Sequence, residues 1–535
     1  MEKRSILENK FYLYITEFFA GMSVMAVELG ASRLLAPYFS SSQIVWTIII
    51  GTIMIAMALG NIYGGKSADK NPNPDRLYIR MIIAALWIAA IPFAGRYIIV
   101  GISALLIVAV NNNFLIIAAF TACMVIFVFP LFLLGTVTPS LARYTVDSLD
   151  DSGKTVGTLG AFNTVGSIIG TFLPTFVTIP AVGTSATFLI FAGILLLLSL
   201  IYFLSKKEKA VKMTAAALAF VILAAAGARG SFAFWDKNLT YEGESVYNYL
   251  QVKEDADTVQ LSTNVLFGVQ SVKIKDGSLT GMYYDYAMAA PALAGLSQDS
   301  PADVLILGMG TGTYASQLLR YYPDFKIEGV EIDGKITDLA REYFDLSGDI
   351  EVVTYDGRAY LQATDKKYDV IMVDAYQDIT IPFQMSSEEF FRLVREHLKD
   401  NGVMVVNLNM RSSEAGNINS WLCDTAASVF GRVYTADVPR STNRELFASA
   451  SGVIDASALR AAALGCEDED LENLLLEIYA ALEEYDAGTL IFTDDKAPVE
   501  LLGMSVIDGL IDNEIGYYRE VFRSGGISGL IAELQ

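Results

Sequence analysis

The residues best suited to chemistry begin with a glycine-rich turn, "GMGTGT", at residues 308–313. It follows the apolar run "DVLIL" and precedes a helical pattern. Glycines let the main chain approach a ligand closely, and the first N–H groups of a helix are free to bind it. The spacing is GxGxG rather than the GxGxxG of dinucleotide sites, so NAD is not favoured. We expect this turn to bind a cofactor through Gly308, Gly310, Thr311 and Gly312.

Three acidic residues stand where later strands are expected to end. Glu331 closes "IEGVEI", 23 residues after Gly308, where a carboxylate can accept both hydroxyls of a ribose. Asp356, followed by Gly357, comes after "IEVVTY" and can accept an adenine amino group. Asp374 closes "YDVIMVD", where the reacting groups would meet. Each acid alone would also fit a helix cap or a surface position, but together with the turn they predict an adenosyl-cofactor site.

Strands and helices alternate around these residues, which indicates a parallel sheet that binds ligands at the carboxyl ends of its strands. We therefore expect an α/β Rossmann-like domain, similar to S-adenosylmethionine methyltransferases, over residues 301–535. Short alternating stretches before it, such as "TVQLSTN" and "QSVKIKDG", predict a small antiparallel β part over 231–300.

The first 230 residues have a different character. Apolar segments of about 20 residues, enough to cross a bilayer as a helix, lie near 11–36, 43–63, 78–100, 114–136, 157–180, 184–204 and 213–229. They predict a polytopic domain of about seven helices in the cell membrane, with the lipid bilayer as a partner. The first segment is longer than a signal-peptide core, so we expect it to be retained. Residues 97–110 could extend the third helix, form a re-entrant segment or form an eighth helix.

The charge distribution and the supply of a cofactor give opposite indications about which side of the membrane the C-terminal half occupies. Residues 1–230 carry 16 Lys and Arg against 10 Asp and Glu, and the remainder carries 22 against 50. With seven helices and a cytoplasmic N-terminus, the basic loops lie inside and the acidic half lies outside. An eighth helix, or the supply of a cytoplasmic cofactor, would favour the inside.

Two carboxylates stand within the first apolar segment. Glu17 and Glu28 are eleven residues apart, and at about 100° per residue they share one helix face. Charges at membrane depth usually face the interior of a helix bundle. A path for a cation or polyamine and a structural ion pair, for example with Arg33, are both consistent with this placement.

Composition excludes several classes of function. The net charge of −22 argues against nucleic-acid binding and fits either a cationic substrate or simple solubility. The three cysteines show no CxxC spacing, so no metal site is expected. The one histidine, His397, fits a surface or helix-capping role. Any mechanism must therefore use carboxylates, tyrosines and the main chain.

From about residue 240 onward the chain resembles the spermidine synthase (polyamine aminopropyltransferase) family, and over nearly its full length the membrane-fused, multi-pass type. The segments that carry the resemblance are "ESVYNYLQV", "LFGVQS", "YDYAMAAPAL", "VLILGMGTGT", "VEID", "DGRAYL", "YDVIMVDAYQDITIPFQMSSEEFF" and "TDDKAPVE", with "VELGASRLLAPYFSSSQIVWT" and "LGTVTPSLAR" in the apolar half.

The resemblance implies that an amine attacks the aminopropyl carbon of decarboxylated S-adenosylmethionine and that methylthioadenosine leaves. It implies that Asp374 orients and deprotonates the amine with help from Tyr283 or Tyr284. Gln270 and Glu331 would hold the donor, and Asp378 would bind the far amine of a diamine such as putrescine. A homodimer is expected from the family.

The chain departs from the family pattern at three places. Thr311 stands where the family usually has an acid that binds the amine of the donor. The segment 284–286 is Tyr-Asp-Tyr, where the family has Tyr-His-Glu. The spacing from Asp374 to Asp378 is one residue longer than in the Asp-x-x-Asp-Pro motif of the family. We therefore weigh an aminopropyltransferase-like enzyme against a methyltransferase that uses S-adenosylmethionine itself. A third alternative is an amine transporter whose soluble part senses a nucleoside.

Overall fold

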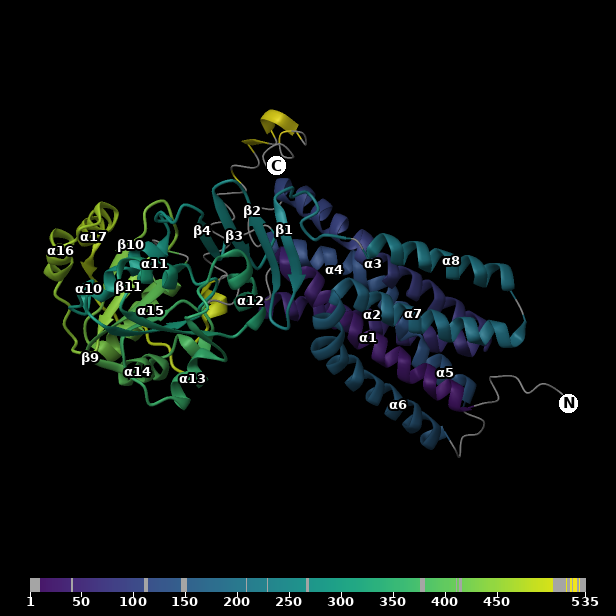
Figure 1. The fold of residues 1–535 in the computed structure, drawn as a ribbon. Helices are drawn as coiled ribbons and strands as arrows, with labels where there is room; N and C mark the ends of the chain where they lie inside the picture. The colour runs from purple at the N-terminus through teal and green to yellow at the C-terminus, as the bar shows by residue number, and fades with distance from the viewer. Residues whose placement is uncertain are drawn as a thin grey trace.

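The computed structural model shows two parts joined end to end, a long helix bundle and an α/β part (Figure 1). It describes residues 10–503 except 40–41, 110–113, 146–151, 208, 229, 266–268, 376–380, 410 and 413–415, together with isolated positions between 516 and 529.

The bundle consists of eight helices among the described residues. They are α1 (Lys10–Phe39), α2 (Gln43–Lys70), α3 (Pro74–Ala109), α4 (Phe114–Gly135), α5 (Val137–Thr145), α6 (Ser152–Leu173), α7 (Ile179–Lys206) and α8 (Ala210–Gly227). The stretch 97–110, which was ambiguous in the sequence, continues α3 as far as Ala109.

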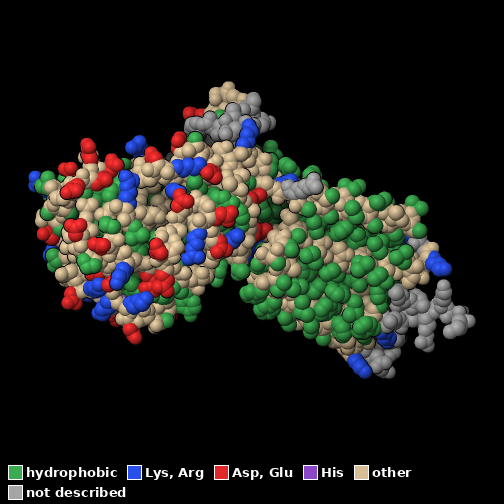
Figure 2. Space-filling view, in the orientation of Figure 1, with side chains coloured by type: hydrophobic (Ala, Val, Ile, Leu, Met, Phe, Trp, Pro, Cys, Tyr) green, Lys and Arg blue, Asp and Glu red, His purple; other side chains and the backbone are tan. Residues whose placement is uncertain are grey.

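Six helical stretches of the described chain are long and apolar enough to cross a membrane, where the sequence predicts about seven. The difference arises because α6, a π-helical turn (Pro174–Thr178) and α7 form one stretch of 55 residues. Gly183 interrupts this stretch with a φ of 81°. Hydrophobic side chains cover the visible face of the bundle, whereas acidic and basic side chains gather on the α/β part (Figure 2).

Glycines bring α1 and α6 into close contact along their length. A Cβ atom on Gly170 would lie 2.8 Å from the carbonyl carbon of Met22, and one on Gly166 would lie 2.8 Å from that of Phe18. Small residues allow this approach of two main chains, as is common between membrane helices.

The α/β part contains two sheets. The first is antiparallel, in the order β1 (Leu239–Glu244), β2 (Tyr249–Glu254), β3 (Thr258–Ser262) and β4 (Ser271–Ile274). The second has the order β12-β10-β11-β9-β8-β5-β6-β7, with β5 (Ala302–Leu307), β6 (Phe325–Glu331), β7 (Glu351–Thr354), β8 (Tyr368–Val373), β9 (Leu398–Leu408), β10 (Tyr434–Asp437), β11 (Arg444–Ser449) and β12 (Glu483–Glu484).

In the second sheet β5 to β9 pair in parallel, and the strand order reverses at β5, which lies between β6 and β8. Such a reversal opens a crevice at the carboxyl ends of the strands. The connecting helices are α9 (Tyr283–Ala287), α10 (Ala289–Leu293), α11 (Thr313–Tyr321), α12 (Gly334–Tyr343), α13 (Gly357–Ala363), α14 (Glu388–Glu396), α15 (Ile418–Phe430), α16 (Ser457–Leu464) and α17 (Glu469–Ala481). The predicted fold class, a helical region followed by a small β segment and a Rossmann-like domain, is confirmed.

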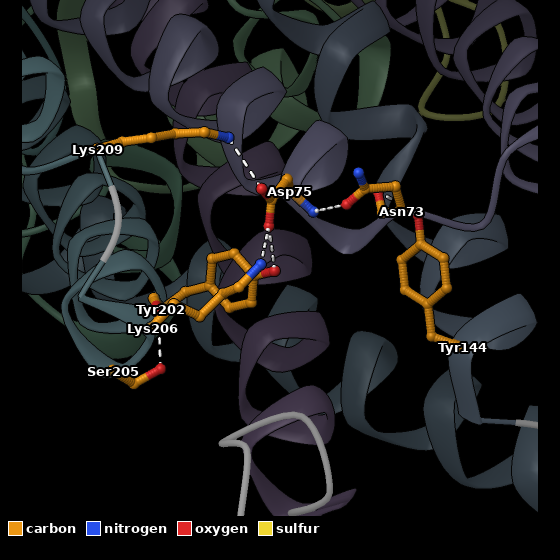
Figure 3. A network of polar contacts seen from close by, with 7 residues as sticks. All are labelled: Asn73, Asp75, Tyr144, Tyr202, Ser205, Lys206 and Lys209. Carbon is orange, nitrogen blue, oxygen red and sulfur yellow. Dashed lines mark hydrogen bonds and ion pairs between the residues drawn. The ribbon is translucent and has the colours of Figure 1, made fainter.

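The two ends of the bundle have different partners. At one end the hydroxyl of Tyr38 donates to the carbonyl of Phe232 (2.9 Å), close to the first sheet. At the other end Asp75, at the start of α3, pairs with Lys206 (2.7 Å) and Lys209 (2.9 Å) and accepts a hydrogen bond from Tyr202 (2.5 Å) (Figure 3). This cluster ties the α2–α3 connection to the α7–α8 connection, far from the α/β part (Figure 1).

We predict that Gly170→Val forces α1 and α6 apart, because its side chain would meet the main chain of Met22. The expected loss is about 1–3 kcal/mol of unfolding free energy, measured by denaturant titration of the purified full chain. Gly160→Val is the matched control, because it lies on the same helix and a Cβ atom there meets nothing within 4 Å. Equal stability of the two variants would contradict the close contact.

Candidate active site

A cavity of about 280 Å³ lies at the carboxyl ends of β5, β6, β7 and β8 and is covered on one side by the first sheet. Its lining includes most of the residues selected from the sequence: Gln270, Gly308, Gly310, Glu331, Asp356, Gly357 and Asp374. Residues from five different segments therefore meet at the crevice that the strand order opens.

The glycine turn is shaped by its contacts with the neighbouring strand. Gly308 has a φ of 87°, and a Cβ atom there would lie 2.8 Å from the Cα atom of Ala375. Only glycine combines that backbone conformation with that closeness. Gly310 has a φ of 53°, and its N–H donates to Glu331 (2.9 Å). The turn and the acid at the end of β6 thus form one unit.

Glu331 is fixed by main-chain donors. One carboxylate oxygen accepts from Gly310 and the other accepts from the N–H of Asp333 (3.0 Å). Burial raises the pKa of Glu331, and these two hydrogen bonds oppose that rise. Because each oxygen has further lone pairs, the carboxylate can still accept ligand hydroxyls from the cavity side.

Asp356 serves two purposes in the structure. Its carboxylate caps α13 by accepting from the N–H of Ala359 (2.8 Å), and it also lines the cavity beside Tyr355 and Gly357. The helix-cap interpretation and the ligand-binding interpretation of this residue are therefore compatible.

Asp374 follows β8 and is held by two donors from distant segments. The hydroxyl of Tyr283 donates to one oxygen (2.6 Å), and the side-chain amide of Asn407 donates to the other (2.9 Å). Burial raises the pKa of Asp374 to about 7, although both hydrogen bonds act to lower it. A carboxylate poised near neutrality is suited to take a proton from a reacting group.

Tyr283, not Tyr284, contacts Asp374. The hydroxyl of Tyr284 donates instead to the carbonyl of Gln270 (2.9 Å), so its contact is with the wall of the cavity. Of the two tyrosines that the resemblance left open, Tyr283 is therefore the one that donates a hydrogen bond to Asp374. The next residue, Asp285, is buried and accepts from Gly281 (2.6 Å) and Gln317 (2.7 Å), which indicates a structural role.

Sequence reasoning missed Asn407, which closes "VMVVN" in β9. Its side chain also accepts from the amide of Asn443 (2.7 Å). The available signal was its position, a polar residue after four apolar ones in a buried strand next to β8.

The remaining predicted residues lie elsewhere. Thr311 is buried, its hydroxyl is 3.2 Å from that of Thr313, and it does not line the cavity. Gly312 has a φ of 78° and precedes α11. Asp378 falls outside the described residues. His397 follows α14, and its ring nitrogens lie 2.8 and 3.0 Å from the carbonyls of Leu393 and Thr364.

The two carboxylates of α1 do not line this cavity. Glu17 is fully buried and accepts from Thr138 (2.5 Å) and Asn163 (2.8 Å), while Glu28 is partly exposed. Arg33 donates to the carbonyl of Val246. Among the described residues, no group of three or more His, Cys, Asp or Glu side chains is arranged to hold a metal ion.

Known proteins match the α/β part of this chain, and one of the matches extends over 63% of the chain. Residues 285–442 match the family model described as the spermine/spermidine synthase domain. A probable polyamine aminopropyl transferase from Bifidobacterium longum (strain NCC 2705) is 56% identical over 352 residues, 63% of this chain and 78% of that protein. A polyamine aminopropyltransferase from Vibrio vulnificus (strain CMCP6) is 29% identical over 286 residues, 51% of this chain and 93% of that protein. The crystal structure of a spermidine synthase in complex with the transition-state analogue AdoDATO has a TM-score of 0.36 and 21% identity, covering 44% of this chain and 84% of that one.

The contacts of Asp374 predict a pH dependence. Because the pKa of Asp374 is raised to about 7, the rate should rise with pH through neutrality as the carboxyl ionises. Tyr283→Phe removes a donor that lowers this pKa, so the rising limb should move to higher pH by about one unit. The measurement is kcat/KM against pH for both proteins with the same substrates, so that ionisation of the substrate cancels.

Tyr284→Phe is the matched control, because its hydroxyl bonds to Gln270 rather than to Asp374. In Tyr284→Phe the rising limb of the profile of kcat/KM against pH should lie at the same pH as in the unaltered protein, whatever the effect of the substitution on the rate. A limb that moves equally in both variants, or in neither, would contradict the assignment of Tyr283.

Proposed function

This chain belongs to the spermine/spermidine synthase family of polyamine aminopropyltransferases, and we propose that it transfers an aminopropyl group from decarboxylated S-adenosylmethionine to an amine such as putrescine. The single observation that carries the proposal is the Asp374 carboxylate, held by Tyr283 and Asn407 at the edge of a cavity with the features of an adenosine site.

The proposed reaction is a displacement at carbon. The lone pair of a neutral amine forms the new C–N bond, the C–S bond of the sulfonium breaks, and its electron pair stays on sulfur in methylthioadenosine. The proton lost by the amine goes to Asp374. Since the leaving group is already good, the enzyme mainly has to position the reactants and keep the amine deprotonated.

The cavity residues supply the positioning. Gly308 and Gly310 present main chain to the nucleoside, Glu331 accepts the ribose hydroxyls, Asp356 receives the adenine amino group, and Gln270 helps to hold the donor. The acidic surroundings of Asp374 favour a cationic acceptor over an anionic one.

One observation favours a second candidate, a methyltransferase that uses intact S-adenosylmethionine. The turn from Gly308 to Thr313 contains no acid, so it would not repel a donor that keeps its carboxylate. Thr311 is buried rather than turned to the cavity, which leaves the two donors to be separated by experiment.

Product analysis tests the proposal directly. We expect the purified full chain to release methylthioadenosine from decarboxylated S-adenosylmethionine when putrescine is added, with at least about a hundredfold loss in Asp374→Asn. Mass spectrometry of parallel reactions with the two donors makes the distinction. Adenosylhomocysteine from the intact donor would instead establish the methyltransferase, and nucleoside binding without either product would favour a sensor attached to a transporter.

We further propose that the bundle crosses the cell membrane and that the α/β part lies outside the cytoplasm. The end of the bundle opposite the α/β part carries the Asp75, Lys206 and Lys209 cluster, and Arg143 pairs with Asp69 there (3.4 Å). An excess of basic residues marks the cytoplasmic ends of membrane helices. The supply of the donor from the cytoplasm is the consideration against this orientation.

Labelling of intact cells tests the orientation. A cysteine at exposed Tyr355 of the α/β part, in a chain whose three own cysteines are replaced by serine, should react with a membrane-impermeant maleimide. A cysteine at exposed Lys70, at the basic end, should react only after the cells are lysed. The reverse pattern would place the α/β part in the cytoplasm.

A further inference from the structure

The first sheet is attached to the helix bundle by charged and polar contacts at the turn between β1 and β2. Thr184, near the start of α7, donates to the two oxygens of Glu244 through its N–H (2.7 Å) and its hydroxyl (2.6 Å). Arg33 of α1 donates to the carbonyl of Val246. Two helices from different parts of the bundle therefore hold the same short turn.

The same turn also holds Asp333, which lies two residues after the cavity residue Glu331. Ser245 donates to Asp333 (2.5 Å), and the side-chain amide of Asn248 donates to the same oxygen (2.9 Å). Asp333 is only 2% exposed, and its other oxygen caps α12 through Lys335 (3.1 Å). The turn thus fixes the start of α12.

From Asp333 the contacts reach the cavity. The N–H of Asp333 donates to one oxygen of Glu331 (3.0 Å), while the other oxygen accepts from Gly310 (2.9 Å). A continuous series of hydrogen bonds and neighbouring residues therefore runs from Thr184 through Glu244, Ser245 and Asp333 to Glu331, which is the residue expected to bind the ribose.

A second cavity supports this connection. It has a volume of about 240 Å³, lies between the bundle and the β1–β2 turn, and is lined from the helix side by Arg33 and Trp46. Tyr247, Asn248 and Thr263 line both this cavity and the active-site cavity. These three residues therefore form a wall between the cavity beside the helices and the active-site cavity.

We propose that α1 and α7 are part of the nucleoside site: by holding the β1–β2 turn, Thr184 and Arg33 position Asp333 and, through it, Glu331. The bundle then contributes to donor affinity as well as to attachment. Thr184 and Arg33 are positioning residues, since they do not line the active-site cavity. The inference rests on the proposed function only in taking an adenosine-type nucleoside as the ligand.

The alternative is a docking contact that only keeps the two parts together. That alternative predicts a loss of thermal stability with unchanged affinity in the folded protein, whereas positioning predicts weaker nucleoside binding and a higher KM for the donor with kcat retained. Coupling through such a series typically changes affinity by about threefold to twentyfold when one member is removed.

The test uses the full chain in detergent, with methylthioadenosine as the probe in isothermal titration calorimetry. Thr184→Val and Glu244→Gln should each weaken binding by about threefold to twentyfold, and Thr184→Ser, which keeps a hydroxyl, should bind as the unaltered chain does. Thr187→Val is the matched control on α7, because the hydroxyl of Thr187 bonds to Thr178 (2.9 Å) and Gly183 (2.9 Å) rather than to the turn.

Ser245→Ala tests whether the contacts act in series. If they do, the double variant Thr184→Val with Ser245→Ala should bind methylthioadenosine with the same affinity as whichever single variant binds it more weakly, because both substitutions break the same series. Affinity in Thr184→Val and Glu244→Gln equal to that of the unaltered chain would overturn the inference. Failure of the unaltered chain to bind methylthioadenosine would count against the proposed function instead, so the two failures are distinguishable.

Discussion

A carboxylate taken out of water needs hydrogen-bond donors, and the donors to Asp374 come from two segments far apart in the sequence. Tyr283 is on the short helix α9 that follows the antiparallel sheet, and Asn407 is on β9. Both can reach Asp374 because β8 lies between β5 and β9 and because the first sheet is held over the crevice. The strand order, the position of the first sheet and the attachment of that sheet to the helices together bring these two donors to the buried carboxylate of Asp374.

The buried acids of the α/β part differ in the hydrogen-bond donors they receive, and such donors favour the charged form of an acid. Asp374 and Glu331 each accept two hydrogen bonds, which act against the rise in pKa that burial causes. Glu445 of β11 stands opposite Asn407 in the register and is fully buried, with no partner for either oxygen among the described residues. Burial and the neighbouring Asp374 raise the pKa of Glu445 well above its ordinary range. Burial without donors therefore favours the neutral form of Glu445, in contrast to the two carboxylates that line the cavity.

Residues whose positions follow from the pattern of strands could be predicted from the sequence, whereas individual side-chain contacts could not. The glycine turn and Glu331, Asp356 and Asp374 could be placed because strand ends in a parallel sheet meet at one edge. The choice between Tyr283 and Tyr284 could not be made, since adjacent residues in a helix point about 100° apart and the sequence does not fix the rotation of a five-residue helix. Asn407 was missed because its partner lies 33 residues away, and hydropathy does not reveal the π-helical turn between α6 and α7.

The thin wall of Tyr247, Asn248 and Thr263 between the two cavities also matters for inhibitor design. Under the proposed function, a nucleoside analogue would bind in the active-site cavity, which related enzymes are expected to share, so it would discriminate poorly among them. A compound extended past this wall would meet Arg33 and Trp46, which belong to α1 and α2 of the helix bundle. Selectivity against enzymes that lack the helix bundle would therefore come from contacts away from the reacting groups.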